Sequence, residues 1–235
     1  MHPPCSIVEL RQYTLYPGQR DTLITLFERE FIESQEACGL QLIGQFRDLD
    51  DPDRFVWLRG FADMPSRAEA LAAFYGGPVW QANRDAANAT MVDSDDVLLL
   101  RPLEGHGFTL PTAAPEPAGL VVATLCFFDA PVDERFVRFF DEAVAPRLAA
   151  TGGASVARLV TEPSANNFPR LPVREGEPVF ASFARFADER AHREHLAALE
   201  ADATWRREVE PELLRRLKAP LRSLRLQPTA RSRLA

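Results

Sequence analysis

The sequence predicts an α+β protein made of two copies of one small module, each a four-stranded antiparallel sheet backed by helices. Three observations support this fold class. Segments typical of strands and helices follow the order strand, helix, strand, strand, helix, strand twice along the 235 residues. A proline-rich stretch without periodicity separates the two occurrences, as expected of a linker. Residues of the first occurrence also recur in the second at a shift of 125 positions.

The first half opens with a strand. Apolar and polar residues alternate over residues 6–14, and this period of two is typical of a strand. Pro17 and Gly18 end the pattern, and an apolar stripe at helical spacing then runs from Asp21 to Gly39. The remaining elements follow from the same patterns: strands at 40–47, 55–62 and 97–100, and helices at 66–75 and 79–89.

The second half repeats this order after the linker. Its strands are expected at 120–128, 154–161, 179–186 and 221–226, and its helices at 132–150, 188–199 and 203–217. Pro146 is expected to kink or break its helix, because proline has no backbone N–H and its ring collides with the preceding turn. The predicted domains are a first module at 1–104, a linker at 105–117, a second module at 118–228 and a tail at 229–235.

The repeat is visible in single residues. At the shift of 125, Phe55 aligns with Phe180 and Trp80 aligns with Trp205. The tryptophan match is the informative one, because the chain holds only three tryptophans. A repeated unit that leaves one sheet face uncovered must bury that face against a partner. We therefore expect sheets to pair, within one chain or between chains, and the protein to form a homodimer or a higher homo-oligomer.

Composition excludes several classes of partner. The formal net charge is −7 with both signs mixed along the chain, whereas a protein that binds the nucleic-acid backbone needs a basic face. No apolar run approaches the roughly 20 residues of a membrane helix, and no signal peptide is expected. The three cysteines form no CxxC pair, which indicates free thiols and a cytoplasmic location. We expect a small-molecule ligand, and neither a nucleic acid nor a membrane.

Specific residues of the first half resemble the NIPSNAP family. The run 9–15, which is followed by a Pro-Gly pair, is similar to the opening signature of that family. The runs 55–61 and 77–80 are similar to the middle of the same domain. The likeness covers residues 6–104 well and residues 118–227 more loosely, because the second half lacks the Glu-Leu-Arg run.

The resemblance implies the dimeric α/β-barrel, a ferredoxin-like fold in which two sheets pair face to face. Relatives with that fold include cofactor-free monooxygenases, haem enzymes and small lyases. Because one fold hosts many unrelated functions, the resemblance predicts architecture better than reaction.

The strand faces predict where a site lies. Val8 and Leu10 of the first strand, with Val56 and Leu58 of the third, form apolar faces that we expect to meet the helices. The opposite face would then line the barrel interior. It carries the polar and aromatic side chains of both strands: Glu9, Arg11, Tyr13, Phe55, Trp57, Arg59 and Phe61. Such an apolar wall with few polar groups suits a small anionic or aromatic ligand.

Each polar side chain of this face has a candidate role. Arg11 and Arg59 are candidate substrate-binding residues, because a guanidinium offers a planar fork to a carboxylate. Trp57 would form the wall of the site. Glu9 or Tyr13 is the candidate catalytic group, if burial tunes its pKa for proton transfer. The alternative is that Glu9 and Arg11, two residues apart on one strand face, form an ion pair with a purely structural role.

A loop at residues 162–178 is the second candidate. It has 17 residues without periodicity, and loops of that length inside compact domains are usually functional or disordered. Its apolar residues and prolines argue against disorder. We expect a lid or a dimer-contact arm, with Asn167, Phe168 and Arg174 as candidate substrate-binding residues.

Two histidines on one helix are the last candidates. His192 and His195 lie three residues apart and could share a metal ion, but solvent exposure or packing is the preferred interpretation. No histidine lies next to Trp80 or Trp205, which disfavours haem. Cys126 lies in an apolar strand and is expected to be an inert buried thiol. We expect no metal and no cofactor.

The leading functional hypothesis is an enzyme with a small-molecule cavity. Its most concrete form is a cofactor-independent monooxygenase or a lyase that acts on a small organic substrate, anionic if the arginines bind it. The alternative is a non-catalytic member of the NIPSNAP family that uses the cavity for binding or the paired sheets for assembly. A haem-binding protein is the third hypothesis.

Overall fold

The computed structural model of the chain describes residues 5–111 and 119–234. Part of the expected linker, residues 112–117, lies outside the described residues, as do the chain ends 1–4 and 235. Every strand and helix expected from the sequence is present. The largest difference is the fourth strand, which extends well N-terminal to the expected 97–100. Its polar N-terminal part pairs with the end of the first strand, so hydrogen bonding rather than an apolar pattern extends it.

The first half contains four strands, β1 (Ile7–Leu15), β2 (Gln41–Asp48), β3 (Arg54–Phe61) and β4 (Met91–Pro102). Its helices are α1 (Arg20–Leu26), the π-helical η1 (Phe27–Phe31), α2 (Ile32–Ala37), α3 (Met64–Gly76) and α4 (Pro78–Asn88). The second half contains β5 (Leu120–Phe127), β6 (Ser155–Thr161), β7 (Val179–Phe186) and β8 (Arg222–Pro228). Its helices are α5 (Glu134–Phe139), η2 (Phe140–Val144), α6 (Ala145–Ala150), α7 (Glu189–Ala201), η3 (Trp205–Val209) and α8 (Glu210–Arg215).

The helices that follow β3 and β7 begin in the same way. The carboxylate of Asp63 accepts a hydrogen bond from the backbone N–H of Ser66 at 2.7 Å, and Asp188 accepts one from Ala191 at 2.7 Å. Each aspartate satisfies an N–H that the first helical turn leaves without a partner. The two caps lie 125 positions apart, so the repeat of the sequence is also a repeat of local structure.

Proline accounts for a break in the long helix of the second half. The predicted kink at Pro146 is confirmed as a π-helical turn, η2, which ends two residues before this proline. Proline has no N–H to donate to the carbonyl one turn before it, and its ring would collide with that carbonyl. The wider π-helical turn moves the carbonyl away from the Pro146 ring. Pro211 follows η3 in the same manner at the start of α8.

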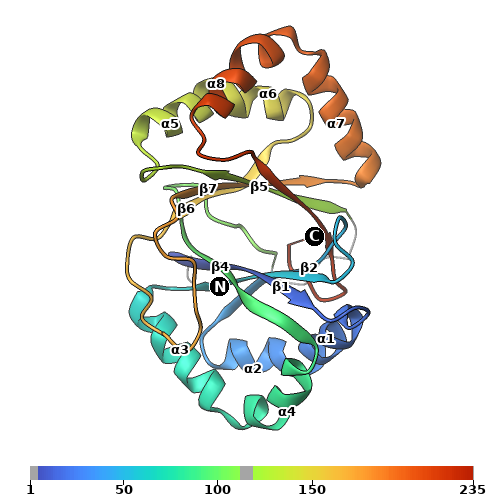
Figure 1. Cartoon of the computed structure of the whole chain (residues 1–235), viewed down its shortest axis with the longest axis vertical. Coiled ribbons are helices and arrows are strands. Elements are labelled where there is room, and N and C mark those ends of the chain that lie inside the picture. The colour runs from blue at the N-terminus through green and yellow to red at the C-terminus, as the bar shows by residue number, and fades with distance from the viewer. Residues whose placement is uncertain (1–4, 112–118, 235) are drawn as a thin grey trace.

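The eight strands form one closed antiparallel barrel in the order β1-β3-β2-β8-β5-β7-β6-β4. Two seams join the halves: β2 pairs with β8 and β4 pairs with β6. The barrel therefore closes within one chain, and the two halves share one sheet instead of forming clearly separate modules. The helices of each half cover the outside of its own strands, at opposite ends of the molecule (Figure 1).

The barrel interior is filled with apolar side chains, most of them aliphatic. Residues from all eight strands pack there in one cluster, which includes Val8, Leu10, Val56 and Leu58. The expectation that these four side chains meet the helices is therefore wrong. The period of two correctly grouped the residues of each face. Both faces of β1 and β3 are buried, however, so the pattern could not say which face lies inside. An interior of this size can be filled by side chains alone.

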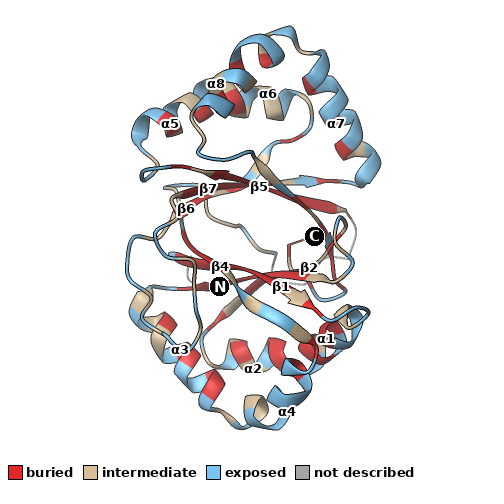
Figure 2. Cartoon of the chain, viewed as in Figure 1, coloured by how far each residue is buried: buried red, intermediate tan, exposed pale blue. Residues whose placement is uncertain are grey.

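The polar and aromatic face of β1 and β3 points outward, into the layer between the sheet and the first-half helices. Tyr13, Phe55, Trp57 and Phe61 pack there against the helices. In Figure 2 most of the barrel strands are buried, and the outer faces of the helices are exposed. None of the described helices is long and apolar enough to cross a membrane.

Two segments cross from the second half to the first. Residues 229–234, expected as part of a tail, follow β2: Thr229 N–H donates to the Gln45 carbonyl at 2.9 Å, and Leu234 N–H donates to the Ile43 carbonyl at 3.0 Å. The loop at 162–178 extends from the end of β6 to α3 before the chain returns to β7 (Figure 1). This loop brings second-half residues to the first-half site.

Candidate functional site

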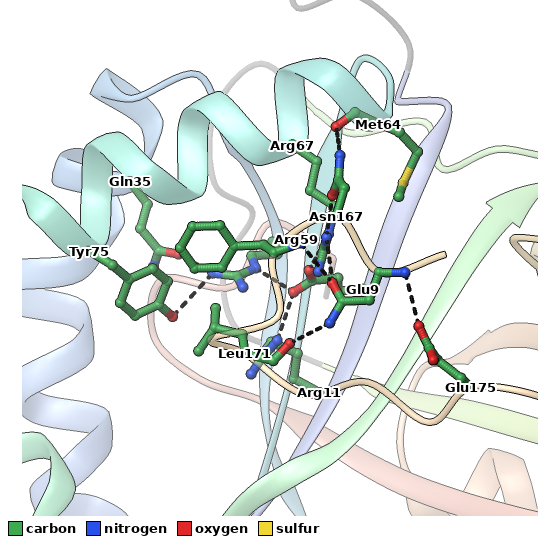
Figure 3. Close-up of polar contacts among 12 residues, drawn as sticks. Glu9, Arg11, Gln35, Arg59, Met64, Arg67, Tyr75, Asn167, Leu171 and Glu175 are labelled. Carbon is green, nitrogen blue, oxygen red and sulfur yellow. Dashed lines mark hydrogen bonds and ion pairs between the residues drawn. The ribbon is translucent and has the colours of Figure 1, made fainter. Parts of the chain in front are cut away.

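Glu9 lies at the centre of a buried cluster of arginines. On β1, Glu9 pairs directly with Arg59 on β3, and Arg11 follows two residues later on the same face. The carboxylate accepts hydrogen bonds from Arg11 Nη1 at 2.8 Å, from Arg59 Nε at 2.7 Å and from Arg67 Nε at 2.7 Å. Arg67 reaches Glu9 from the first turns of α3 (Figure 3). The cluster therefore ties the sheet to its covering helix.

Burial makes this cluster electrostatically unusual. The four side chains are at most 1% exposed. Burial alone would raise the pKa of the Glu9 carboxyl, but the charges of Arg59, Arg11 and Arg67 together outweigh it and hold that pKa below its usual range. Burial lowers the pKa of Arg67, partly offset by Glu9. One carboxylate faces three guanidinium groups, which leaves two positive charges in excess.

Three buried N–H donors in this layer have no hydrogen-bond acceptor among the described residues. They are Nη2 of Arg59, Nη2 of Arg67 and Nε1 of Trp57. Other groups of the same arginines are satisfied by neutral partners: Arg59 Nη1 donates to Gln35 Oε1 at 3.2 Å and to the Tyr75 hydroxyl at 3.4 Å. A buried donor without an acceptor is costly, so each unsatisfied one needs a physical explanation.

Aromatic rings fill the space beside the arginines. The Arg11 guanidinium lies 5.4 Å from the Tyr13 ring centre and 5.6 Å from that of Trp57. Arg11 Nε also donates to the Tyr13 hydroxyl at 3.0 Å. Burial raises the pKa of Tyr13, and Arg11 only partly opposes it. Proton transfer by Glu9 or Tyr13 stays a prediction, and the directions of both pKa values argue for fixed charge states.

The loop at 162–178 covers the cluster. Asn166 Oδ1 and Asn167 Oδ1 accept hydrogen bonds from Arg67 Nη1 at 3.0 Å and 2.7 Å. The Phe168 ring lies 6.2 Å from that of Tyr75. Figure 3 shows Asn167 between Arg67 and Met64, directly above Glu9. Two of the three loop residues expected at the site, Asn167 and Phe168, are therefore brought to it.

The third loop residue, Arg174, lies elsewhere. Its guanidinium pairs with Asp96 at 3.0 Å and with Glu177. It lines a cavity of about 560 Å³ at the base of the loop, together with Arg101 and Glu162. No contact joins Arg174 to the Glu9 cluster among the described residues.

The second half has a cavity where the first half has this cluster. The strand registers align Glu9, Arg11 and Tyr13 with Val122, Thr124 and Cys126, and Trp57 and Arg59 with Ser182 and Ala184. Every replacement is smaller. A cavity of about 490 Å³ lies there between the sheet and the second-half helices. The open space beside the sheet therefore lies in the second half, and the first half holds the ion cluster at the equivalent positions.

This second-half cavity has an apolar wall with a few polar groups. Aromatic and aliphatic side chains form most of its lining, including Phe140, Val144, Phe180, Phe186, Leu199, Trp205 and Leu213. Its polar lining consists of the hydroxyl groups of Thr124, Ser182 and Ser223, the imidazoles of His192 and His195, and the charged side chains of Glu200, Arg206 and Glu210. Cys126 is inert there, because burial raises the pKa of its thiol to about 12.

The two histidines are buried, and their surroundings favour the neutral imidazole. Burial lowers the pKa of both imidazoles, and for His192 the neighbouring His195 and Arg225 lower it further. His195 Nδ1 lies 2.8 Å from Thr151 Oγ1 and 3.2 Å from the Thr151 carbonyl oxygen. Donation from Nδ1 to that carbonyl leaves Nε2 as the acceptor in the neutral ring. A neutral imidazole can therefore accept a proton from a ligand in the cavity.

Gly153 makes room for the His195 ring. A Cβ atom at residue 153 would lie 2.4 Å from His195 Cε1, well inside van der Waals contact. Any larger residue would push the imidazole aside. Within residues 5–111 and 119–234, no three His, Cys, Asp or Glu side chains gather closely enough to hold a metal ion.

Fold and cavity define the class of the protein: an antiparallel α/β barrel with a ligand-sized space between sheet and helices. A candidate monooxygenase from Fusobacterium nucleatum subsp. nucleatum has a TM-score of 0.59 at 11% identity, over 97% of this chain and 94% of its own. An anthrone oxidase-like protein has a TM-score of 0.59 at 16% identity, over 95% of this chain and 91% of its own. At such identities the likeness shows the fold alone.

The first half identifies the family. Residues 8–104 match the NIPSNAP family model. A NIPSNAP-like domain protein from Burkholderia xenovorans is 31% identical over 46% of this chain and 95% of that chain, with a TM-score of 0.41. Through this segment the chain belongs to the NIPSNAP family, which confirms the resemblance seen in the sequence. A search of the curated proteins finds no match to the chain.

Sequence reasoning missed the residues that the helices contribute. Arg67 was passed over because a charged residue in an exposed-looking helix is usually solvated, yet it is fully buried. His192 and His195 were noted but assigned to solvent or packing. One signal was available: at the shift of 125, Arg67 aligns with His192, so both halves place a polar helical side chain over the same sheet position.

Proposed function

We propose that this protein is a cofactor-independent oxygenase whose substrate binds in the second-half cavity. The proposal rests on one observation: an open cavity and a candidate base lie at the same place. The position filled by Trp57 and Arg59 in the first half is open in the second, and the neutral imidazoles of His192 and His195 line the open space. A volume of about 490 Å³ lies within the range of small-molecule sites.

The lining favours a flat aromatic substrate with an acidic proton. Apolar walls bury the rings, while the hydroxyls of Thr124 and Ser182 orient its oxygen atoms. His195 Nε2 takes the acidic proton, because its lowered pKa keeps it neutral at pH 7. The resulting carbanion reduces O₂ directly, which removes the need for a cofactor.

The overall change balances without an external reductant. A ring methylene becomes a carbonyl group, so the substrate loses two hydrogen atoms and gains one oxygen atom. That oxygen comes from O₂, and the second oxygen atom leaves as water with the two hydrogens. The names of the two structural neighbours, a candidate monooxygenase and an anthrone oxidase-like protein, support this reaction class.

The test is oxygen consumption with anthrone, whose central methylene has the required acidity. We expect uptake of one O₂ per anthrone converted and one labelled atom in the product when ¹⁸O₂ is supplied. His195→Asn keeps a donor toward Thr151 but removes the base, so turnover falls at least 100-fold, in line with the contribution of general bases. His106→Gln, which does not line this cavity, serves as the matched control and retains turnover.

If the protein binds the substrate without turnover, the alternative of a non-catalytic ligand-binding protein is favoured. Anthrone that binds the wild-type protein but consumes no oxygen would give that result. Haem stays the third hypothesis and is tested by the absorption spectrum of the purified protein, since bound haem colours it.

Three further expectations belong to this proposal. We propose that residues 1–104 and 118–228 are two modules of common design, supported by their matching registers and helix caps. We also propose a cytoplasmic location, supported by the free cysteines Cys5, Cys38 and Cys126. The homo-oligomer remains a prediction for light scattering to test, although a barrel that closes within one chain removes the original reason for it.

A further inference from the structure

The first-half cluster holds positive charge that nothing nearby balances. Glu9 is the only acidic group in contact with Arg11, Arg59 and Arg67 among the described residues. Their remaining partners are neutral: amide, hydroxyl and backbone carbonyl oxygens. Burying uncompensated charge is expensive, so an excess of this kind indicates a counter-ion that binds from outside.

The unused donors define what that counter-ion must offer. Nη2 of Arg59, Nη2 of Arg67 and Trp57 Nε1 are buried N–H groups without acceptors among the described residues. An oxyanion can accept several N–H groups at once, and a guanidinium binds it with shorter, stronger hydrogen bonds than it makes to a neutral oxygen.

The loop at 162–178 supplies weak substitutes for such an anion. Asn166 and Asn167 both direct neutral amide oxygens at Arg67 Nη1. Asn167 is exposed. An anionic oxygen at this position would bind Arg67 more strongly than either asparagine does.

The loop has hydrogen bonds of its own besides its contacts with the first half, where Phe168, Leu171 and Val173 pack against the core. Asn166 Nδ2 donates to the Leu171 carbonyl at 2.9 Å, and Asn166 N–H donates to Glu175 Oε1 at 2.9 Å. Both bonds lie within the loop, so neither depends on Arg67. Its ends are held by backbone bonds to β4, from Glu162 N–H to Leu99 O at 2.9 Å and from Arg174 N–H to Val97 O at 2.8 Å.

We propose that Arg59 and Arg67, held in place by Glu9, form a binding site for the oxyanion group of a small molecule, a carboxylate or a phosphate. The loop at 162–178 is its lid. When the ligand enters, Asn166 and Asn167 release Arg67, and the oxyanion takes their place and satisfies the unused guanidinium N–H groups. This site is separate from the second-half cavity, because it lies between β1, β3 and α3.

Thermal unfolding tests binding directly, with inorganic phosphate and benzoate compared against chloride at equal ionic strength. We expect a saturable rise in Tm with at least one oxyanion, of about 5 °C or more at a hundredfold excess over Kd. Phosphate alone raising Tm identifies a phosphate site, and benzoate alone identifies a carboxylate site. The rise should be lost in Arg67→Gln. No saturable rise with either oxyanion, or an undiminished rise in Arg67→Gln, overturns the proposal.

A second variant tests the site without any added ligand. Asn167→Asp places a carboxylate on the loop against Arg67, so it should act as a built-in anion. We expect it to raise Tm and to abolish the response to phosphate and benzoate. Ala165→Asp adds the same charge to an exposed position of the same loop and is the matched control. Equal Tm values for the two variants would show that the cluster has no need of an anion. No oxygenase substrate is present, so this result is independent of the proposed reaction.

Discussion

Arg67 and His192 occupy equivalent positions in the two halves of the molecule. Each lies four residues after its capping aspartate, and its backbone N–H donates to the carbonyl of that aspartate, at 3.0 Å for Arg67 and 3.2 Å for His192. Both side chains are buried over the outer face of the sheet. In the first half the layer is filled by an ion cluster, and in the second it is open. The same scaffold thus carries two different chemical environments.

Filling the second-half cavity should abolish its function without unfolding the chain. Ser182 takes the place that Trp57 fills in the first half, so Ser182→Trp should fit the fold while occupying the cavity. We expect oxygen uptake with anthrone to fall at least tenfold, with little change in Tm. Val156→Trp, at an exposed site on β6, should leave uptake unchanged. Full uptake in Ser182→Trp would place the reaction elsewhere.

Removing the Glu9 charge should destabilise the protein strongly. Glu9→Gln leaves three buried guanidinium groups without their carboxylate, and breaking a buried ion pair on one side costs about 3–5 kcal/mol. Urea unfolding measures the loss. Glu33→Gln removes an exposed partner of Arg231 and should change the unfolding free energy by about 0.5 kcal/mol or less. Similar values for the two variants would contradict the buried cluster.

Stability should fall on acidification in two separable windows. The pKa values of His192 and His195 are lowered by burial, so the unfolded chain binds protons first, and stability falls as pH drops below about 6.5. The pKa of Glu9 is lowered by its arginines, so a second loss begins below about pH 5, as the unfolded carboxyl protonates.

Variants assign each window. Replacing both histidines by asparagine should flatten the unfolding free energy between about pH 6.5 and pH 5, and leave the steeper acid limb in place. Urea unfolding at a series of pH values measures both limbs. An unchanged upper window in the double variant would mean that the histidines are not shielded from protonation.

Gly153 should be needed for activity rather than for folding. Gly153→Ala would place a Cβ atom 2.4 Å from His195 Cε1, so the imidazole must shift. We expect a loss of turnover with anthrone of at least tenfold and a changed chemical shift of the His195 ring in NMR spectra. Gly107→Ala is the control, because its Cβ would make ordinary contacts at 3.6 Å with Pro102. Normal turnover in Gly153→Ala would remove His195 from the mechanism.

Local patterns were sufficient for the secondary structure, the repeat and the family. The alternation around Glu9, the capping aspartates at 63 and 188 and the break at Pro146 are all properties of short segments, which neighbouring residues decide. The residues of each strand face were also grouped correctly, since a period of two depends on the backbone alone. The loop at 162–178 was recognised by its length and composition, whereas the contact of Asn167 with Arg67 is visible only in the structure.

Only the tertiary structure decided which face of each strand lies inside the barrel, and this choice relocated the site. When both faces are buried, the period of two is symmetric, and the outcome depends on which face finds its partners in the fold. Val8 and Leu10 pack with apolar side chains of the other strands, whereas Trp57 and Arg59 find aromatic and polar partners on the helices. The open cavity could not be predicted from the sequence either. It lies where small Ser182 and Ala184 occupy the positions that Trp57 and Arg59 fill in the first half, and the helices that enclose it come together only in the folded chain.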